Sequence, residues 1–567
     1  MQKFRLAWLS NARPYGWGAH PKWGTAVLSI SHDLGVVKSL NMLYKLALRT
    51  AIIPLLLAAV STSHAAVPPD HPGGNVVYGI PIYPVCLDGT QSNPTPVVFH
   101  QIVDKLFDQD PQTGAIGPYL ADKWSVEDKA KRYVFHIRGG VSFSNGEKLD
   151  AAVVARNFLT LWDMAKAGRA TAAATYLKGF ISAQATAGEN VVITFDSPNA
   201  GFLQATTEKP LAILSPQTLS TPLAERCARG VIGSGPFVIT DVRQNERIVV
   251  SRRADYNWGS SLFHHQGAAY LDSITFRVIP APSIRAGGLL NGELDAFFDA
   301  STDDLPAIES AGARVITGTS AGVTGTLLFN TSKPIVSEQA VRQAVQHAVN
   351  RQEIVAGLYA GRVKAASGVL SSNHPDYLDQ SAGLTFDPAT STRLLDGAGW
   401  KLGADGIRSR NGERLVIELS YTDLSQQPTF ELIQQQLRKV GIEIKLVALS
   451  VAEGTARYNS GNWQLDWRTW GRADADALVY VYSTQFALLR GMAPRPELET
   501  LLMQQSAEAD PLVRKQLVRK AQQIIIDEAY GVPIREVTLF IPVAPGLQDL
   551  WLINNPYRPV FFDAWRK

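Results

Sequence analysis

Short runs of apolar residues, separated by polar and turn-forming positions, indicate the elements that this chain is expected to form. Tyr133–Ile137 and Leu415–Leu419 are short, apolar and rich in aromatic or β-branched residues, which predicts a β-strand for each. Between residues 430 and 440 the apolar side chains recur at helical spacing, at Phe430, Leu432, Ile433, Leu437 and Val440. This spacing predicts a helix with one face in a core.

The boundaries of this predicted helix, and the element after it, indicate the fold class. Pro428 stands near the start of the helix and Gly441 just past its end, as helix boundaries prefer. A strand over Ile442–Leu446 follows at once. Helix and strand succeed one another with short turns and without an internal repeat, which predicts an α/β architecture. No Pro-rich or Ser-rich linker interrupts residues 70–567, so we expect compact crossings between lobes.

The first 65 residues have the organisation of an export leader preceded by an extension. A charged segment leads into the apolar run Ala51–Val60, which is followed by small residues up to Ala65. This pattern predicts a signal peptide over 42–65, with cleavage after Ala65 or, as second choice, after Ala66. The apolar run is too short to span a bilayer, which takes about 20 residues. We interpret residues 1–41 as an upstream extension, with an unusually long leader as the alternative, and expect a periplasmic location.

The charge of the exported part argues against nucleic-acid binding. The whole chain has a formal net charge of +3, but residues 1–65 hold seven Lys or Arg and one acidic residue. Residues 66–567 therefore hold 47 basic and 50 acidic residues, a net charge of −3. A nucleic-acid-binding protein is expected to carry a basic surplus in its folded part. Nucleic acid is therefore not an expected partner.

The chain has two cysteines, Cys86 and Cys227. In an oxidising compartment two such residues can form one disulfide. We expect the pairing Cys86–Cys227, with two separate buried thiols as the alternative. The exported part has 502 residues, which is enough for two or three lobes.

Seven motifs follow one another in an order that resembles one family of transport proteins. They are Gly73–Gly79, Gly117–Trp124, Tyr133–Gly146, Gly233–Phe237, Phe329–Thr331, Val341–Arg351, and Ala398–Trp400 with Asp405–Ile407. Their order resembles the oligopeptide-, dipeptide- and nickel-binding class of ABC-importer solute-binding proteins, the extracellular solute-binding protein family 5. Ser234 stands where the family's turn has Thr. The glycine-rich motifs are turn formers, so we interpret them as scaffold.

The resemblance implies an α/β, two-lobed periplasmic-binding-protein fold with mixed sheets and a hinge between the lobes. Carried onto this chain, lobe I would be residues 66–320 with 535–567, and lobe II would be residues 321–534. Lobe I would contain an extra subdomain at about residues 106–229. Proteins of this class close on a ligand by hinge motion, and the ligand must contact both lobes to favour the closed state.

The resemblance also implies a function without catalysis. The chain would be a monomeric receptor that uses no cofactor and delivers a peptide-like polar solute to the permease and ATPase subunits of an ABC importer. A sensor or chaperone-like binder on the same fold stays open as an alternative, as does a receptor for an opine or a metal chelate. A nickel-chelate receptor would be expected to place a histidine in the cleft, and no histidine follows His374.

Fragments that suggest an enzyme or a metal site have simpler explanations. Gly318–Gly322 matches the Gly-x-Ser-x-Gly nucleophile elbow, which requires a helix directly after its serine. The segment after it, Val323–Phe329, predicts a strand instead. The chain has neither a Gly-x-x-x-x-Gly-Lys phosphate loop nor a His-Glu-x-x-His motif. Adjacent His264 and His265 are expected in a solvated loop, because neighbours in a strand point to opposite faces.

The segment Asp466–Asp476 is similar to the family's loop that reads the ligand. With Trp470 aligned, Ala473 occupies the position of the aspartate that faces the ammonium of a peptide ligand, and Asp476 aligns with the second aspartate. Asp474 would serve after a one-residue shift, and Arg472 would suit a carboxylate. The predicted ligand-binding residues are Trp470, Arg472, Asp474 and Asp476, with Tyr78 and Tyr83 in the first lobe. The alternative is that these charges cap a surface turn.

Trp463, Trp467 and Trp470 crowd the same stretch. Aromatic rings give a pocket a large contact area without demanding one particular ligand. The spacing of these residues equally fits packing on one face of a helix. Both interpretations stay open from the sequence.

Overall fold

The computed structural model describes residues 71, 73–91, 97–169, 171–484, 493–553 and 559–567. The predicted extension 1–41 and the predicted signal peptide 42–65 lie outside the described residues. Within the described part of the chain, no helix is both long enough and apolar enough to cross a membrane.

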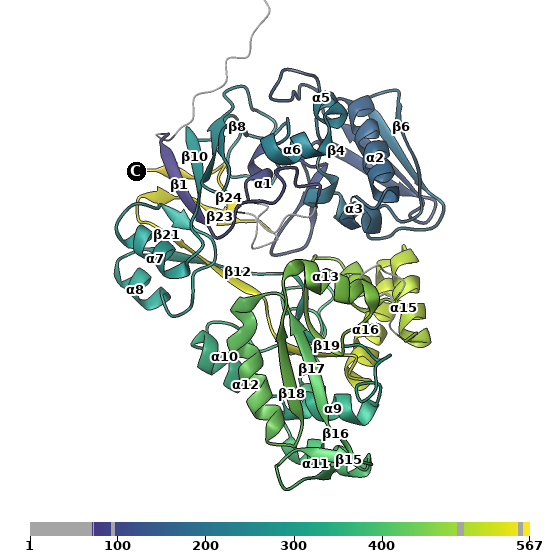
Figure 1. Ribbon diagram of the computed structural model, residues 1–567. Coiled ribbons are helices and arrows are strands. Elements are labelled where there is room, and N and C mark those ends of the chain that lie inside the picture. Colours follow the sequence, from purple (N-terminus) through teal and green to yellow (C-terminus); the bar gives the residue numbers. More distant parts are fainter. Residues whose placement is uncertain (1–70, 72, 92–96, 170, 485–492, 554–558) are drawn as a thin grey trace, which may run out of the picture. The chain divides into compact units, whose positions relative to one another are not determined.

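A seven-stranded mixed sheet contains early strands of the chain and one late strand (Figure 1). Its spatial order is β12, β21, β11, β1, β10, β9 and β8. The bounds are β1 Asn75–Ile80, β8 Phe237–Arg243, β9 Arg247–Arg252, β10 Ser273–Val278, β11 Ala296–Phe297, β12 Arg314–Thr319 and β21 Thr538–Val543. β1 pairs in parallel with β10 and β11, and the other neighbours are antiparallel.

The part of the sequence between β1 and β8 forms a separate antiparallel sheet, in which the strands lie in the order β4, β5, β7 and β6. The bounds are β4 Ala121–Glu127, β5 Arg132–Ile137, β6 Phe180–Thr186 and β7 Asn190–Phe195. Helix α2, Ala151–Lys166, buries Val154, Phe158 and Leu161, which lie on one helical face. Asp150 begins this helix, because its side chain accepts a hydrogen bond from the Val153 amide. The strand predicted at Tyr133–Ile137 is confirmed as β5.

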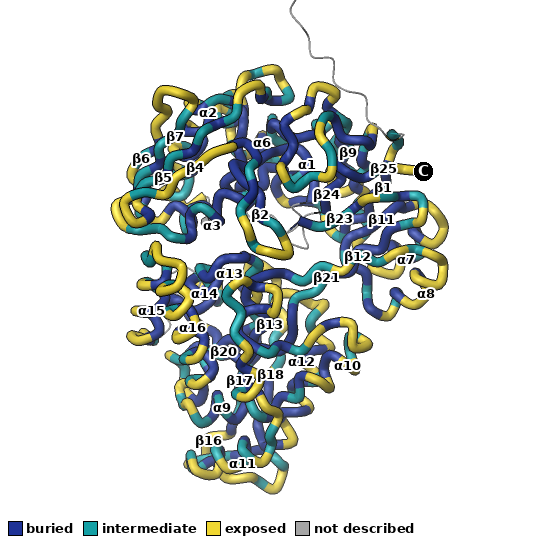
Figure 2. The backbone as a smooth tube through the Cα atoms, turned by 180° about the vertical axis from the view of Figure 1, so that it is seen from behind, coloured by how far each residue is buried: buried dark blue, intermediate teal, exposed yellow. Residues whose placement is uncertain are grey.

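A five-stranded sheet forms the second large core, in the order β18, β17, β19, β13 and β20. The bounds are β13 Gly322–Phe329, β17 Val416–Tyr421, β18 Glu443–Ala448, β19 Leu465–Gly471 and β20 Gly531–Arg535. β13 is buried along its whole length (Figure 2), as expected for a strand with neighbours on both sides.

Helix α12, Gln427–Arg438, connects the parallel strands β17 and β18 and confirms the predicted helix and strand. Its buried residues include Phe430, Ile433 and Leu437, which pack in the core of this sheet. Gly441 has a φ of 87°, a conformation that glycine adopts at little cost, and the chain turns there into β18.

The remaining helices and short strands surround these three sheets. In the first half they are α1 Phe99–Ile102, β2 Phe107–Gln109, β3 Ile116–Pro118, α3 Thr171–Tyr176, α4 Phe202–Ala205, α5 Pro216–Ser220, α6 Leu223–Arg229, α7 Pro282–Leu290 and α8 Leu305–Ser310. In the second half they are α9 Gln339–Ala348, α10 Arg351–Tyr359, α11 Pro388–Gly397, β14 Lys401–Leu402, β15 Arg408–Arg410, β16 Glu413–Arg414, α13 Val451–Ser460, α14 Asp476–Tyr482, α15 Pro496–Ala507, α16 Pro511–Asp527, β22 Leu547–Gln548, β23 Trp551–Leu552, β24 Pro559–Val560 and β25 Trp565–Arg566.

The chain passes between the seven-stranded and five-stranded sheets at two places, from β12 to β13 and from β20 to β21. Two residues connect the strands at each crossing, Ser320–Ala321 and Glu536–Val537. Ser320 is therefore followed by strand β13, as predicted, and the local geometry is not that of a nucleophile elbow.

Two local features belong to the part of the molecule that contains the seven-stranded sheet, whose core we call the first core. Cys86 and Cys227 form a disulfide that joins the segment after β1 to α6. His265 is not solvated as we expected: only 12% of its side chain is exposed, and its ring stacks between Tyr270 and Phe562. Both histidines lie in a loop, as predicted, and His264 is half exposed, but tertiary packing buries His265, whose Nδ1 atom lies 2.9 Å from the Asp563 carboxylate.

Candidate functional site

A cavity of about 1150 Å³ is lined by residues from both large sheets and from Val537 of the second crossing. A volume of this size suits a small organic solute. Its aromatic lining residues are Tyr359, Tyr421, Phe430, Tyr458, Trp463, Trp467 and Phe540. Its charged lining residues are Arg285, Arg457, Arg468, Arg535, Asp299, Asp303, Asp423 and Asp466. The described lining thus carries both signs of charge in equal number, which suits a zwitterionic solute.

Strand β19 positions the aromatic side of this cavity. Our helical alternative for the tryptophans is wrong, because Trp467 and Trp470 lie on a strand. Their side chains point to opposite faces of it. Trp467 packs against the core of the five-stranded sheet and lines the cavity. Trp470 stacks on Tyr480, with ring centroids 3.5 Å apart.

Two arginines of the cavity wall have carboxylate partners close by. Arg457 pairs with Glu418, and the Arg468 Nη2 atom lies 3.0 Å from the Asp466 carboxylate. The Arg468 guanidinium also lies over the Tyr458 ring, 3.6 Å from its centroid, and donates a hydrogen bond to the Tyr458 hydroxyl. These contacts fix both side chains, and they leave the Arg535 and Arg285 guanidinium groups as the cations without a contacting carboxylate in the described lining.

Two aspartates of the cavity wall hold their protons unusually tightly. Burial raises the pKa of Asp299 to about 6, although Arg285 and Arg535 act in the opposite direction. Burial likewise raises the pKa of Asp466 to about 6 against the effect of Arg468. Asp299 also adopts a left-handed backbone conformation, with a φ of 57°. Perturbed carboxyl groups in a cleft are typical of functional sites.

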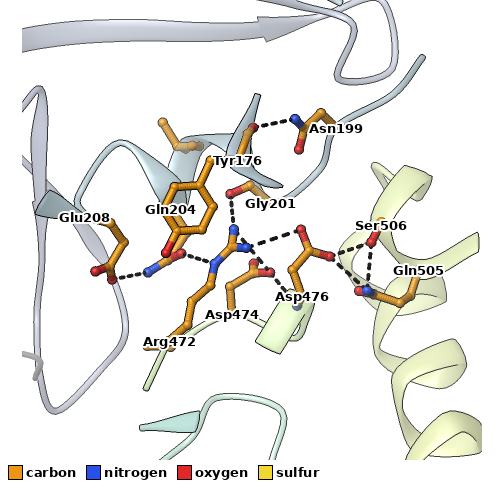
Figure 3. A network of polar contacts seen from close by, with 12 residues as sticks. Tyr176, Asn199, Gly201, Gln204, Glu208, Arg472, Asp474, Asp476, Gln505 and Ser506 are labelled. Atoms are coloured by element: carbon orange, nitrogen blue, oxygen red, sulfur yellow. Dashed lines mark hydrogen bonds and ion pairs between the residues drawn. The ribbon is translucent and has the colours of Figure 1, made fainter. Parts of the chain in front are cut away.

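The structure brings the predicted residues Arg472, Asp474 and Asp476 together in one buried network (Figure 3). The Arg472 Nε atom donates to the Gln204 side-chain oxygen at 2.8 Å, and its Nη2 atom donates to the Gly201 carbonyl at 2.9 Å. The Arg472 guanidinium lies 4.7 Å from the centroid of the Tyr176 ring. This side chain therefore joins the end of β19 to α4 and its neighbours on the first half of the chain.

The two aspartates of the network already have strong partners. Asp474 accepts two hydrogen bonds from Arg514, at 2.7 and 2.8 Å. Burial would raise the pKa of Asp474, but the Arg514 and Arg472 guanidinium groups together lower it well below its usual range. Asp476 accepts hydrogen bonds from Ser506 at 2.6 Å and Gln505 at 2.8 Å. Asp474 also accepts a hydrogen bond from the Asp476 amide at 2.9 Å, so it caps a turn as our alternative held, but the turn is buried and not at the surface.

The other predicted residues lie apart from this network. Tyr78 is fully buried, and its ring packs edge-on against Phe276 and Phe561 in the first core. Tyr83 is partly buried and packs at the border of the same core. The described lining of the cavity includes Trp467 and Asp466 but none of the six predicted ligand contacts. Their assignment as ligand contacts stays a prediction.

Sequence reasoning missed Arg535, Asp299 and Tyr359. Arg535 ends the apolar run Gly531–Arg535, and an arginine that closes a buried strand was the available signal. Nothing in the sequence placed Tyr359 beside it. Among the described residues, no group of three or more His, Cys, Asp or Glu side chains is arranged to hold a metal ion.

Two large sheet cores, joined by two short crossings and lining one polar cavity, define a two-lobed periplasmic-binding-protein fold. The chain belongs to the bacterial extracellular solute-binding proteins of family 5: the family model described as "Bacterial extracellular solute-binding proteins, family 5 Middle" matches residues 115–487. The predicted family and fold class are therefore confirmed.

Known relatives match nearly the whole chain. The nickel-binding periplasmic protein of Escherichia coli (strain K12) is 27% identical over 534 residues, which cover 90% of this chain and 97% of that protein. The probable di/tripeptide-binding protein 5 of Pseudomonas aeruginosa (strain UCBPP-PA14) is 24% identical over 482 residues, which cover 80% of this chain and 88% of that protein. NikA from Brucella suis in complex with Fe(III)-EDTA has a similar structure, with a TM-score of 0.76, 26% identity, and coverage of 87% of this chain and 100% of NikA.

Proposed function

We propose that this protein is a periplasmic receptor that binds a peptide or peptide-like polar solute and delivers it to the permease and ATPase subunits of an ABC importer. The observation that carries the proposal is the cavity of about 1150 Å³, whose walls come from both large sheets. A solute bound there touches both halves of the molecule, so its binding favours their approach. Binding is the whole activity, and no reaction follows from it.

The lobes of this receptor are residues 66–320 with 535–567, and residues 321–534. The crossings at Ser320–Ala321 and Glu536–Val537, where the chain changes sheet, support this division, except that Arg535 ends strand β20 and therefore belongs with residues 321–534. The antiparallel sheet of β4 to β7 supports an extra subdomain in lobe I at about residues 106–229. Hinge motion would then be confined to the short crossings.

The solute class follows from the lining and from the relatives. Guanidinium, carboxylate and aromatic groups suit a small zwitterion that exposes polar ends and an apolar body. The relatives are named for nickel and for di- and tripeptides, and the similar structure holds Fe(III)-EDTA. Peptides, opines, glutathione and metal chelates are therefore the compounds to test first.

The test uses the full chain exported by a bacterial host and purified from the periplasm. We expect a mature protein that begins at Ala66 or Val67, that stays monomeric, and that binds one of these compounds at a 1:1 ratio by calorimetry. A ligand present at 100 times its Kd should raise the free energy of unfolding by about 2.7 kcal/mol. A protein that keeps residue 42, or that binds none of these compounds and releases no solute when denatured, would contradict the proposal.

A further inference from the structure

Arg535 occupies a distinctive place in the cavity wall. It ends strand β20, directly before the crossing to the seven-stranded sheet, and only 7% of it is exposed. Its guanidinium carbon lies 4.7 Å from the centroid of the Tyr359 ring and 5.7 Å from that of Trp467. All three residues line the cavity, and all three belong to the five-stranded half of the molecule.

The hydrogen bonds of Arg535 leave much of its donor capacity unused. Nη1 donates to the Glu536 carbonyl at 3.0 Å, and Nη2 donates to the Gln426 side-chain oxygen at 2.8 Å. Nε has no acceptor. A guanidinium carries five N–H donors, so one donor on each Nη atom is also unassigned. Among the residues that the structure describes, no carboxylate lies within 4.0 Å of this cation.

A cation in this position is incompletely compensated. The attraction of aromatic faces for a guanidinium is smaller than the cost of withdrawing its charge from water. Rings stacked on the flat faces of a guanidinium leave its edge free, and the edge is where a carboxylate binds with two parallel hydrogen bonds. The stack therefore orients Arg535 for an anion that the chain itself does not supply.

The opposite half of the molecule presents a second such cation to the same cavity. Within the part of the chain that the structure describes, Arg285 donates only to backbone carbonyl groups, those of Ile279, Pro280 and Asp299. Asp299 interacts electrostatically with both Arg285 and Arg535, Asp423 acts on Asp299, and Asp304 acts on Arg285. Among the described residues, these carboxylates offset the two arginines only through space, because none of them forms an ion pair with Arg285 or Arg535.

We propose that Arg535 is the group that binds a carboxylate of the transported solute, with the Tyr359 and Trp467 rings holding its guanidinium edge-on to the cavity. The solute is accordingly an organic acid or a zwitterion with a free carboxylate. This inference rests on the proposed receptor function and adds to it the chemistry of one end of the ligand. Because Arg535 lies beside a crossing and lines the same cavity as Arg285, an anion bound there also reduces the positive charge that the two halves bring to the cavity, which favours closure.

The test compares acids with their uncharged derivatives. The full chain purified from the periplasm is titrated with Met-Leu and Met-Leu amide, with glutathione and its diethyl ester, and with Fe(III)-EDTA. The variants are Arg535→Gln, Arg535→Lys and, as a matched control, Arg495→Gln. Arg495 is also a buried arginine, stacked on Tyr530 at 4.2 Å, but it does not line the cavity. It controls for the general cost of losing a buried guanidinium.

We expect at least one acid to bind the parent protein and its uncharged derivative to bind far more weakly. Arg535→Gln should weaken binding of the acid by about 30-fold or more. Arg535→Lys should restore part of it, and Arg495→Gln should leave Kd within about threefold. Equal binding of acid and ester, or an unchanged Kd in Arg535→Gln, would overturn the carboxylate assignment while the receptor function stands. If the parent binds none of the acids, the assignment is likewise overturned, whereas binding of a neutral or cationic solute would still support the receptor function.

Discussion

At the scale of single residues, Asp466 shows how burial ties stability to pH. Its side chain is almost fully buried beside Arg468, and burial raises its pKa to about 6. An aspartate in an unfolded chain has a pKa of about 3.9. The folded state therefore binds the proton more tightly than the unfolded state. It follows that this group lowers the stability of the fold as pH rises from about 4 to about 6.

Asp466→Asn should remove this pH dependence, because the amide has the shape of the protonated acid and cannot ionise. At pH 7 we expect the variant to have a free energy of unfolding higher by about 2 kcal/mol, and at pH 4 a value close to that of the parent. Urea unfolding at pH 4, 5, 6 and 7 measures the difference. Asp163→Asn, at an exposed position on α2, is the control and should stay within about 0.5 kcal/mol of the parent. A constant difference between Asp466→Asn and the parent across this range would contradict the prediction.

At the scale of elements, strand β13 makes room for the aromatic wall of the cavity through one glycine. A Cβ atom added to Gly325 would lie 2.4 Å from Cζ2 of Trp467 and 3.2 Å from the Arg535 carbonyl oxygen. Neither neighbour has free space, because both lie on strands that pair with β13. Glycine, the smallest residue, is therefore needed at position 325, because β13 lies between the strand that holds Trp467 and the strand that holds Arg535.

Gly325→Ala should lower the free energy of unfolding by about 1 to 3 kcal/mol through overpacking. The cost should shrink in a Trp467→Phe background, since phenylalanine lacks the atoms that the new methyl group meets. Urea unfolding of the single and double variants measures this coupling. Gly287→Ala on α7, where no atom lies within 4 Å of an added Cβ, should be neutral or slightly stabilising. Equal costs with and without Trp467 would show that Gly325 is needed for another reason.

At the scale of the whole molecule, two arginines connect the halves in different surroundings. Arg472 is buried and reaches Gly201 and Gln204, whereas Arg362 forms an exposed, two-pronged ion pair with Glu309 of α8. A buried charge that loses its partner costs about 3 to 5 kcal/mol, whereas exposed pairs contribute about 0 to 1 kcal/mol. The buried contact should therefore dominate how the halves associate without ligand.

Arg472→Gln should increase the radius of gyration of the ligand-free protein in small-angle X-ray scattering, and it should lower the urea midpoint. Arg362→Gln serves as the control and should change neither value. The expected order follows from burial, because water screens the exposed pair and not the buried one. An unchanged radius in Arg472→Gln, with both variants folded, would mean that the two crossings alone hold the halves in place.

The sequence by itself determined the elements, the fold class and the family of this protein. Strand and helix periodicity, as in α12 and β5, reports only which face of an element is apolar, and that property is local. The order of short turn motifs then identified the family, since each turn needs particular residues. The same local information left the tryptophans ambiguous, because their spacing fits a helix face as well as a strand.

Only the tertiary structure decided which side chains meet. Arg535 contacts Tyr359, which lies 176 positions earlier in the chain, and Arg472 contacts Gly201, 271 positions away. Such pairs are created when α10 packs beside β20 and when α4 comes to lie beside the end of β19. No pattern confined to a few neighbouring residues contains that information. For the same reason the sequence predicted Asp474 as a ligand contact without its partner Arg514, which the fold brings to it from helix α16.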